Sequence, residues 1–269
     1  MILHAITVYF TLVNFLFPRT IDIIRNQLYD QTREPVDTYQ IEPIGYISSP
    51  YKQKFAIPRQ PRLVPQAKAK LLFCQNFNRE EFVRGIDKFS HLWLLFRFHE
   101  TADKGYSALV RPPRLGGNEK KGVFATRATF RPNGIGMSAV KLEGVEYENG
   151  QLALLLSGID LLDGTPIVDI KPYLPYSDAM HDASAGFADT RPETHMTVSF
   201  SEQADEFIAA QTSYPELRDF IANVLKQDPR PAYKKQKQET QFYGMTLFDF
   251  NIRWQVNESH NQVIEITKQ

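Results

Sequence analysis

Residues 138–161 read SAVKLEGVEYENGQLALLLSGIDL, two apolar runs separated by Glu148-Asn149-Gly150. Asn-Gly between apolar runs is the strongest local signal for a β-hairpin, because both residues tolerate a positive φ. The stretch therefore predicts two antiparallel strands joined by a tight turn.

Short apolar runs of strand length also precede this hairpin. They are IEPIGYIS at 41–48, KAKLLFC at 68–74 and HLWLLFRFH at 91–99. Residues 121–131 alternate and predict a further strand, with Phe124, Thr126, Ala128 and Phe130 on one face and Val123, Ala125, Arg127 and Thr129 on the other. Many short strands with Pro and Gly between them indicate a barrel or a sandwich. We expect this mainly β domain to span residues 39–199.

The pattern changes after residue 200. Ser201 is suited to cap a helix that runs to about 211. A second helix is predicted up to Asp228-Pro229 by apolar residues at helical spacing, namely Leu217, Phe220, Ile221, Val224 and Leu225. A half-buried strand is predicted by the alternation of Phe248, Phe250, Ile252, Trp254 and Val256 with polar residues, and residues 262–267 can pair with it. We expect a small C-terminal α+β domain over residues 200–269.

Residues 1–38 are expected to be an N-terminal extension. They contain an uncharged apolar run at 4–17, shorter than the roughly 20 residues that span a membrane. No Lys or Arg precedes Arg19 and no small-residue cleavage site follows, so the run is not typical of a secretory signal. Three interpretations stay open: an element packed on the rest of the protein, a non-native upstream extension, or a weak membrane anchor. The membrane anchor is the least expected of the three.

Composition excludes several classes of protein. The 269 residues carry 31 basic and 31 acidic side chains, so the formal charge is zero. The single cysteine, Cys74, excludes a disulfide framework and a Cys-rich metal site, and it fits a reducing compartment. The six histidines show no metal-ligand spacing, and dinucleotide-binding, Walker and nucleophile-elbow motifs are absent. We therefore expect a cytoplasmic protein without a metal and without a Rossmann fold.

Charge is segregated along the chain although it sums to zero. Residues 52–70 hold six basic residues and no acidic one, residues 104–131 hold seven and one, and residues 226–237 hold five and one. Residues 177–206 instead hold seven acidic residues and one basic residue. Segregated basic segments can gather a polyanion such as a nucleic acid. Alternatively, the basic segments are only solvent-exposed faces scattered over the surface of the protein.

Rigid polar loops rich in Pro and Gly separate the expected strands. They include PRQP at 58–61, RPPRLGG at 111–117, GVFATRATFRPN at 122–133, DLLDGTP at 160–166 and DIKPYLPY at 169–176. Together with IGYISSPY at 44–51, FSHLW at 89–93, DPRPAY at 228–233 and FDFNIRW at 248–254, they resemble the TsaA-like tRNA methyltransferases, in the bacterial form with a C-terminal domain. The resemblance covers about residues 40–269, and Gly134 stands where members often carry Pro.

This resemblance implies S-adenosylmethionine-dependent N6-methylation of N6-threonylcarbamoyladenosine, next to the anticodon of tRNA. It also implies a single-sheet β-barrel and a homodimer. Two other functions stay open, a non-catalytic nucleotide- or RNA-binding barrel and a methyltransferase for a small-molecule acceptor. The basic segments favour a polyanionic substrate over a small molecule.

By resemblance, the cofactor site uses eleven residues. They are Pro58, Arg59, Gln60, His99, Glu100, Arg127, Met137, Ser157, Gly158, Ile159 and Asp160. Arg127 can hold the methionine carboxylate through two hydrogen bonds, and Glu100 or Asp160 can accept from the ribose hydroxyls or the α-amino group. Alternatively, His99 and Met137 only pack in the core and do not contact the cofactor.

Methyl transfer to N6 requires alignment of the nitrogen with the methyl carbon and an acceptor for the departing proton. Within DIKPY, Asp169 is the candidate proton acceptor and Tyr173 the candidate stacking face for the extruded base. Asp160 and Asp163 are the competing candidates for the proton acceptor. Alternatively, the carboxylate of Asp169 only caps its loop.

Overall fold

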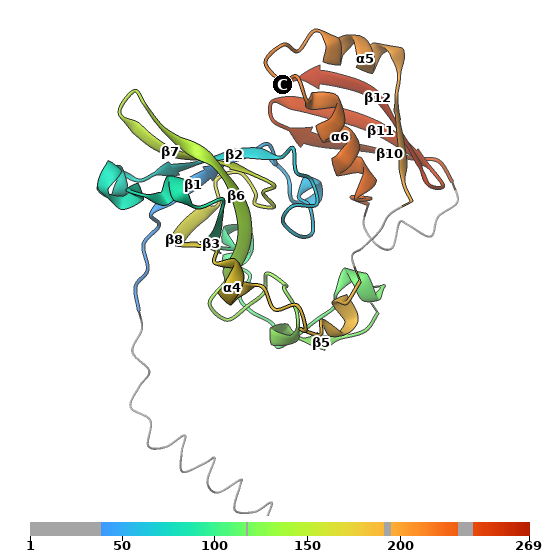
Figure 1. The fold of residues 1–269 in the computed structure, drawn as a ribbon. Coiled ribbons are helices and arrows are strands. Elements are labelled where there is room, and N and C mark those ends of the chain that lie inside the picture. The colour runs from blue at the N-terminus through green and yellow to red at the C-terminus, as the bar shows by residue number, and fades with distance from the viewer. Residues whose placement is uncertain (1–38, 117, 191–194, 231–238) are drawn as a thin grey trace, which may run out of the picture. The chain divides into compact units, whose positions relative to one another are not determined.

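The computed structural model of the chain describes residues 39–116, 118–190, 195–230 and 239–269, and its strands form two main sheets (Figure 1). Residues 42–269 belong to one compact unit. The expected mainly β character is confirmed. Expectations for the apolar run 4–17 fall outside the described residues.

Six strands form a sheet that closes into a barrel in the order β1-β2-β7-β6-β3-β8 (Figure 1). They are β1 (Gly45–Ser48), β2 (Lys68–Phe73), β3 (His91–Arg97), β6 (Ile135–Glu148), β7 (Gln151–Ser157) and β8 (Pro166–Pro172). Every pair is antiparallel, and Gly45 opposite Ile167 closes the ring between β1 and β8. Alternate side chains point inward, so Leu92, Leu94 and Leu154 are fully buried in the core.

The hairpin predicted over residues 138–161 is confirmed. β6 and β7 pair up to Glu148 opposite Gln151, and the turn between them is Asn149-Gly150. Asn149 has a φ of 51° and Gly150 a φ of 79°, which are the left-handed conformations that a tight hairpin turn requires.

The strand predicted over residues 121–131 is wrong. Only Lys121–Gly122 (β5) forms a strand, which pairs with Leu109–Val110 (β4), and a 3-10 helix at Val123–Ala125 follows. The Arg131 guanidinium donates to the carbonyls of Val123 and Thr126 at 3.2 and 2.8 Å. These side-chain hydrogen bonds satisfy carbonyls that a neighbouring strand would otherwise pair, so the alternating sequence curls into a loop.

Short helical turns occupy most of the other connections. The α-helical turns are α3 (His99–Ala102) and α4 (Pro175–Asp178). The 3-10 helices are η1 (Lys54–Ala56), η2 (Gln75–Phe77), η3 (Glu80–Val83), η4 (Ile86–Lys88), η5 (Pro113–Leu115), η6 (Val123–Ala125) and η7 (Gly186–Ala188). No helix among the described residues is long and apolar enough to cross a bilayer.

The C-terminal domain combines a four-stranded sheet with two helices, as expected. Its strands β9 (Thr197–Phe200), β10 (Gln241–Leu247), β11 (Phe250–Asn257) and β12 (His260–Lys268) lie in the order β10-β11-β12-β9. Both predicted helices are present, α5 (Glu202–Ala209) and α6 (Leu217–Lys226). Ser201 caps α5 by accepting from the amide of Ala204, and α6 buries all five apolar residues of its predicted face.

Three details of this domain differ from the sequence pattern. Phe248 lies in the turn before β11, with a φ of 56°, instead of in the strand. β10 was not expected. β9 spans the expected boundary between residues 199 and 200 and pairs in parallel with β12, so it belongs to the C-terminal sheet.

Tyr51 connects the barrel to the C-terminal domain. It is fully buried, forms a β-bridge with Leu247, and its ring centroid lies 5.9 Å from that of Phe220. The adjacent amide of Phe248 donates to the carbonyl of Pro50 at 2.8 Å. The segment after β1 is therefore part of both cores.

Candidate functional site

The loop that contains PRQP is held against the end of β7. The amide of Arg62 donates to the carbonyl of Gly158 at 2.8 Å. Gly158 has a φ of 68°, and a Cβ there would lie 3.4 Å from the Cα and Cγ of Arg62. A glycine is therefore needed where residues 157–160 pass this loop.

Arg127 joins this pair of loops from the long β5–β6 connection. Its guanidinium donates to Oε1 of Gln60 at 2.5 Å, and its side chain is otherwise exposed. The structure thus brings together Gln60, Arg127 and the segment that ends at Asp160.

Asp160 is the buried charge of this cluster. Burial raises the pKa of its carboxyl to about 6, against the opposing effects of a hydrogen bond from Ser138 and the charge of Arg127. Its Oδ1 is buried and has no hydrogen-bond partner among the described residues. A buried acceptor without a partner is costly, which is typical of an atom that binds a ligand. We call Gln60, Arg127, Ser138 and Asp160 the Asp160 cluster.

Sequence reasoning missed two residues that lie near Asp160, Ser138 and Tyr51. Ser138 lies on β6 and is only 3% exposed, on the inward face that it shares with Val140 and Leu142. A polar residue at an inward position of a strand was the available signal. The buried Tyr51 hydroxyl also lacks a hydrogen-bond partner within the described part of the chain. Burial, then the charge of Asp160, raise the pKa of that phenol; no local pattern indicated this.

Asp163, which competed for the acceptor role, has structural partners. Its Oδ1 accepts from the amide of Ser49 at 2.9 Å, and its Oδ2 lies 2.7 Å from Nζ of Lys52. The Ser49 hydroxyl in turn donates to the carbonyl of Leu161. Asp163 therefore holds the 160–165 loop against the segment that follows β1.

The remaining cofactor candidates occupy varied environments. Pro58 is buried, Arg59 is exposed, and Ile159 packs in the core. The Ser157 hydroxyl donates to Glu143, whose pKa is lowered by this bond and by Lys141.

His99 and Glu100 begin α3, with Nε2 and Oε1 3.8 Å apart. Met137 is 56% exposed on β6, opposite Leu95. No hydrogen bond or ion pair within the described part of the chain joins these three residues to the Asp160 cluster.

Asp169 and Tyr173 lie along β8 and just beyond its end. Asp169 is exposed opposite Leu95, and its Oδ1 accepts from the amide of Ile170 at 2.9 Å. The ring of Tyr173 lies 5.5 Å from that of Trp93 and 6.3 Å from that of His91. The two candidates are four positions apart, about 13 Å along an extended chain, and their roles stay predictions.

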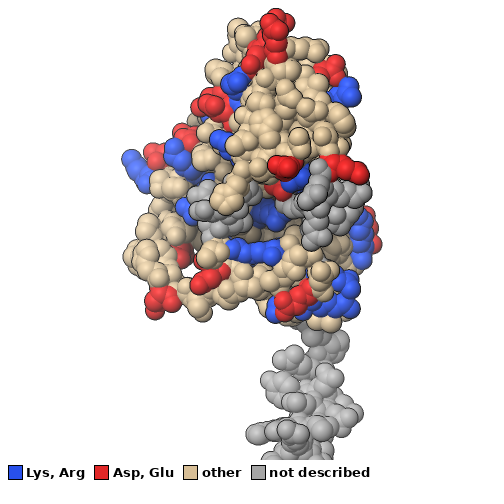
Figure 2. Space-filling view, turned by 90° about the vertical axis from the view of Figure 1, so that its right-hand side faces the viewer, with Lys and Arg blue, Asp and Glu red and all other residues tan. Residues whose placement is uncertain are grey.

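Charged side chains of both signs are scattered over the face drawn in Figure 2. On the face drawn in Figure 2, several Lys and Arg side chains gather around the middle, whereas most acidic ones lie nearer the edges. Of the three basic segments, 52–70 is described completely, and much of 226–237 lies outside the described residues. No group of three or more His, Cys, Asp or Glu side chains that could hold a metal occurs among the described residues.

Comparisons with known proteins match both halves of the chain. The tRNA-methyltransferase O N-terminal domain matches residues 46–179, and the TrmO C-terminal domain matches residues 193–269. The tRNA (adenine(37)-N6)-methyltransferase of Escherichia coli (strain K12) is 48% identical over 232 residues, which are 86% of this chain and 99% of that protein.

A more distant relative and a solved structure agree with this match. A protein of Pyrococcus abyssi, named probable S-adenosyl-L-methionine-binding protein, is 39% identical over 54% of this chain and 73% of its own length. The crystal structure of TrmO from Pseudomonas aeruginosa is 42% identical with a TM-score of 0.68, over 87% of this chain and 100% of that chain.

Proposed function

We propose, from the finding that this chain belongs to the tRNA-methyltransferase O family, that it methylates N6 of adenine 37 in tRNA with S-adenosylmethionine as donor. We further propose that the acceptor is N6-threonylcarbamoyladenosine. The observation that carries the proposal is the Asp160 cluster, which presents beside Arg127 a buried carboxylate oxygen that has no hydrogen-bond partner among the residues the structure describes.

The Asp160 cluster fits the polar groups of S-adenosylmethionine. Arg127 would bind the carboxylate, and Oδ1 of Asp160 would accept from the α-amino group or a ribose hydroxyl. The backbone of Gly158 and Ile159 would face the adenine edge. When bound, the cofactor supplies a methyl group on a positively charged sulfur. The other proposed cofactor contacts are Pro58, Arg59, Gln60, His99, Glu100, Met137 and Ser157.

Asp169 and Tyr173 are proposed to act on the acceptor base, Asp169 as proton acceptor and Tyr173 as stacking face. Because they lie four positions apart, about 13 Å along an extended chain, their substitutions should have separable effects. Asp169→Asn should lower kcat by roughly 100-fold or more without changing cofactor affinity. Tyr173→Ala should mainly raise KM for tRNA, by a factor that corresponds to about 1–3 kcal/mol.

Single-turnover kinetics with saturating tRNA would separate these two effects. A wild-type rate for Asp169→Asn would show that this carboxylate is structural. An unchanged KM for Tyr173→Ala would show that the ring serves only to pack on Trp93.

The reaction can be tested on two forms of one tRNA, with and without the threonylcarbamoyl group at adenosine 37. The protein and labelled S-adenosylmethionine are incubated with each form, and the nucleosides are then separated. Label on N6-methyl-threonylcarbamoyladenosine alone is the expected result. Label on unmodified adenosine would contradict the proposed acceptor, and binding of both ligands without any transfer would favour the non-catalytic barrel.

We also propose that the protein is a cytoplasmic homodimer. Eight large apolar side chains are exposed in two stretches of the barrel domain: Tyr106, Leu109, Phe124, Phe130, Ile135 and Met137, then Tyr176 and Met180. A contiguous exposed apolar patch is typical of an interaction surface, and we propose that these side chains form such a patch between two copies of the chain. Sedimentation equilibrium should give twice the mass of the chain, and Phe124→Glu should reduce it to one chain. A wild-type monomer would contradict the homodimer.

A further inference from the structure

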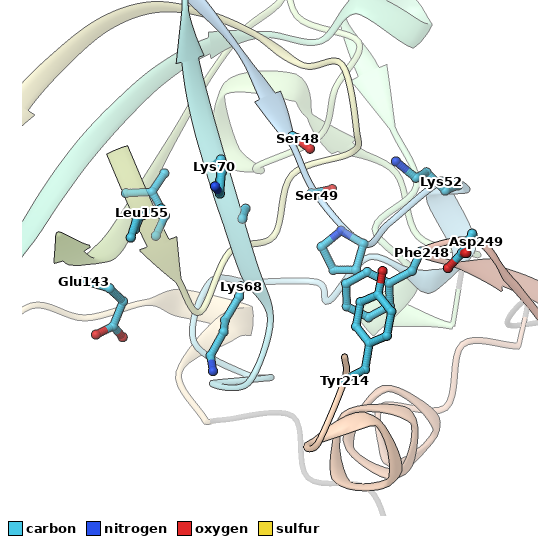
Figure 3. A pocket seen from close by; sticks show the side chains of 13 residues that line it. Ser48, Ser49, Lys52, Lys68, Lys70, Glu143, Leu155, Tyr214, Phe248 and Asp249 are labelled. Atoms are coloured by element: carbon cyan, nitrogen blue, oxygen red, sulfur yellow. The ribbon is translucent and has the colours of Figure 1, made fainter. Parts of the chain in front are cut away.

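An open cleft of about 870 Å³ lies where the outer side of the barrel meets the C-terminal domain (Figure 3). The barrel contributes Ser48, Ser49, Pro50 and Lys52 and the outward side chains of β2. The C-terminal domain contributes Tyr214 and Phe248. No member of the Asp160 cluster lines this cleft, so the cleft is separate from the proposed cofactor site.

Two aromatic rings form one side of the cleft. Tyr214 precedes α6 and Phe248 lies in the turn between β10 and β11, and their ring centroids are 4.6 Å apart. Both are partly exposed, and both pack on the ring of Phe250. A partly exposed ring fixed by its neighbours is a suitable face for stacking a nucleobase.

Three lysines, Lys52, Lys68 and Lys70, line the cleft as well. Lys68 and Lys70 project from the same face of β2, about 7 Å apart along the strand (Figure 3). Each lysine pairs with one carboxylate: Lys52 with Asp163, Lys68 with Glu216 and Lys70 with Glu146. The side chains of Lys68 and Lys70 are 69% and 47% exposed, and exposed pairs of this kind contribute little stability, so phosphates can replace Glu216 and Glu146.

The two carboxylates that line the cleft already have cationic or hydroxyl partners. Glu143 accepts from Ser157 and pairs with Lys141 at 3.0 Å. Oδ2 of Asp249 lies 3.4 Å from Nζ of Lys268, whereas its buried Oδ1 has no hydrogen-bond partner among the described residues. These two carboxylates therefore repel a phosphate less strongly than two carboxylates without cationic partners would.

The cleft is physically connected to the Asp160 cluster. Ser49, in the cleft wall, donates to the carbonyl of Leu161, and Asp163 holds both Ser49 and Lys52. Asp160 lies on the same loop as these partners. A molecule bound in the cleft would thus contact the segment that supports the proposed cofactor site.

We propose that this cleft binds a single-stranded part of the tRNA, with backbone phosphates at Lys68 and Lys70 and a base on the ring of Tyr214. The inference rests on the proposed function, because it assigns a second contact area to the same substrate. Basic side chains beside partly exposed rings are the usual combination for single-stranded nucleic acid. The cleft draws these groups from both domains, so both are needed for tRNA binding.

The test measures tRNA affinity as a function of salt, separately from methyl transfer, with the full chain. Lys68→Ala and Lys70→Ala should each reduce the slope of log K against log salt by about 1. Tyr214→Leu, which keeps an apolar side chain against Phe248, should weaken tRNA binding by about 5- to 100-fold, whereas Tyr214→Phe should bind normally.

Two control variants carry matched changes outside the cleft. Lys88→Ala removes an exposed lysine of η4, and Phe242→Ala removes a 67% exposed ring of β10. Both should bind tRNA like the wild type, and all variants should bind S-adenosylmethionine normally in calorimetry.

If Lys68→Ala, Lys70→Ala and Tyr214→Leu keep wild-type tRNA affinity and salt slope, the cleft proposal is refuted while the proposed function stands. If the wild-type protein binds no tRNA and transfers no methyl group to it, the proposed function itself fails. Equal losses in the control variants would also overturn the cleft as the binding site.

Discussion

Arg127 is the exposed cation of the Asp160 cluster, and it is fixed by its hydrogen bond to Gln60. If it binds the carboxylate of the cofactor, Arg127→Ala should weaken S-adenosylmethionine binding by about 1.5–3 kcal/mol, the range for a charged hydrogen bond. Calorimetry would measure the change. Arg253→Ala, an exposed arginine of β11 that pairs with Glu265, is the control. Unchanged affinity in folded Arg127→Ala protein would remove this residue from the site.

If Asp160 binds the cofactor, the raised pKa of its carboxyl should make cofactor binding dependent on pH. With a pKa of about 6 in the free protein, the carboxyl is mostly ionised at pH 7 and mostly protonated at pH 5. If the ionised form accepts from the cofactor, affinity should be constant above about pH 7 and fall by up to tenfold per unit below pH 6. Calorimetry between pH 5 and 8 should show this fall in the wild type and a flat, weaker affinity in Asp160→Asn.

The free energy of unfolding of the unliganded protein should depend on pH in the opposite sense to cofactor affinity, because the Asp160 contribution to it is largest at low pH. Its pKa is raised on folding, so protonation favours the folded state. This contribution is fully present below the unfolded pKa of about 4 and is lost as pH rises through about 6. Protonation of Asp160 does not destabilise the folded protein, so weaker cofactor binding at pH 5 would not result from unfolding caused by this residue. A pH-independent wild-type affinity would show that the cofactor does not discriminate between the two forms of this carboxyl.

Two glycines of one strand, β6, give a matched test of how closely its neighbours pack. A Cβ on Gly136 would lie 2.5 Å from the ring of Phe96 and 2.7 Å from that of Phe98, whereas a Cβ on Gly144 would meet only Leu155 at 3.9 Å. Neither glycine has a positive φ. Gly136→Ala should therefore lower the free energy of unfolding by about 1–3 kcal/mol, and Gly144→Ala should leave it nearly unchanged. Urea denaturation of the two variants would measure both, and equal stabilities would contradict the close contact at Gly136.

At the scale of elements, the sequence was most informative where a pattern is local. Asn149-Gly150 and the apolar face of α6 depend on neighbours a few residues away, and both predictions are confirmed. The alternation at 121–131 was misleading because strand pairing needs a partner, and Arg131 satisfies the carbonyls instead. Closure of the barrel depends on Gly45 opposite Ile167, more than 100 residues apart, which no local pattern records.

The candidate site shows the same limit. The motifs identified Gln60, Arg127 and Asp160 through resemblance, and the structure brings these three together. Ser138 and Tyr51 were not expected, because their relevance arises only when distant segments pack around Asp160. Long-range packing therefore defines the surroundings of the carboxylate, while the sequence motifs identify the carboxylate itself.

At the scale of the whole molecule, a closed barrel limits what the N-terminal extension can contribute. Every strand of the ring has two partners within residues 45–172, so the barrel has no open edge that residues 1–38 could complete. The match to the family also begins at residue 46. Deletion of residues 1–38 should therefore leave a soluble protein with wild-type cofactor affinity and methyl transfer.

Deletion of residues 1–48 is the matched control, because it also removes β1 and leaves β2 and β8 each with one unpaired edge. That shorter protein should aggregate or melt well below the wild type, since the inward side chain of Ile47 is lost from the core as well. Solubility, thermal unfolding and transfer of labelled methyl groups would compare the three proteins. If the deletion of 1–38 aggregates like that of 1–48, the apolar run 4–17 packs on the body of the protein, and the start of the fold lies upstream of residue 39.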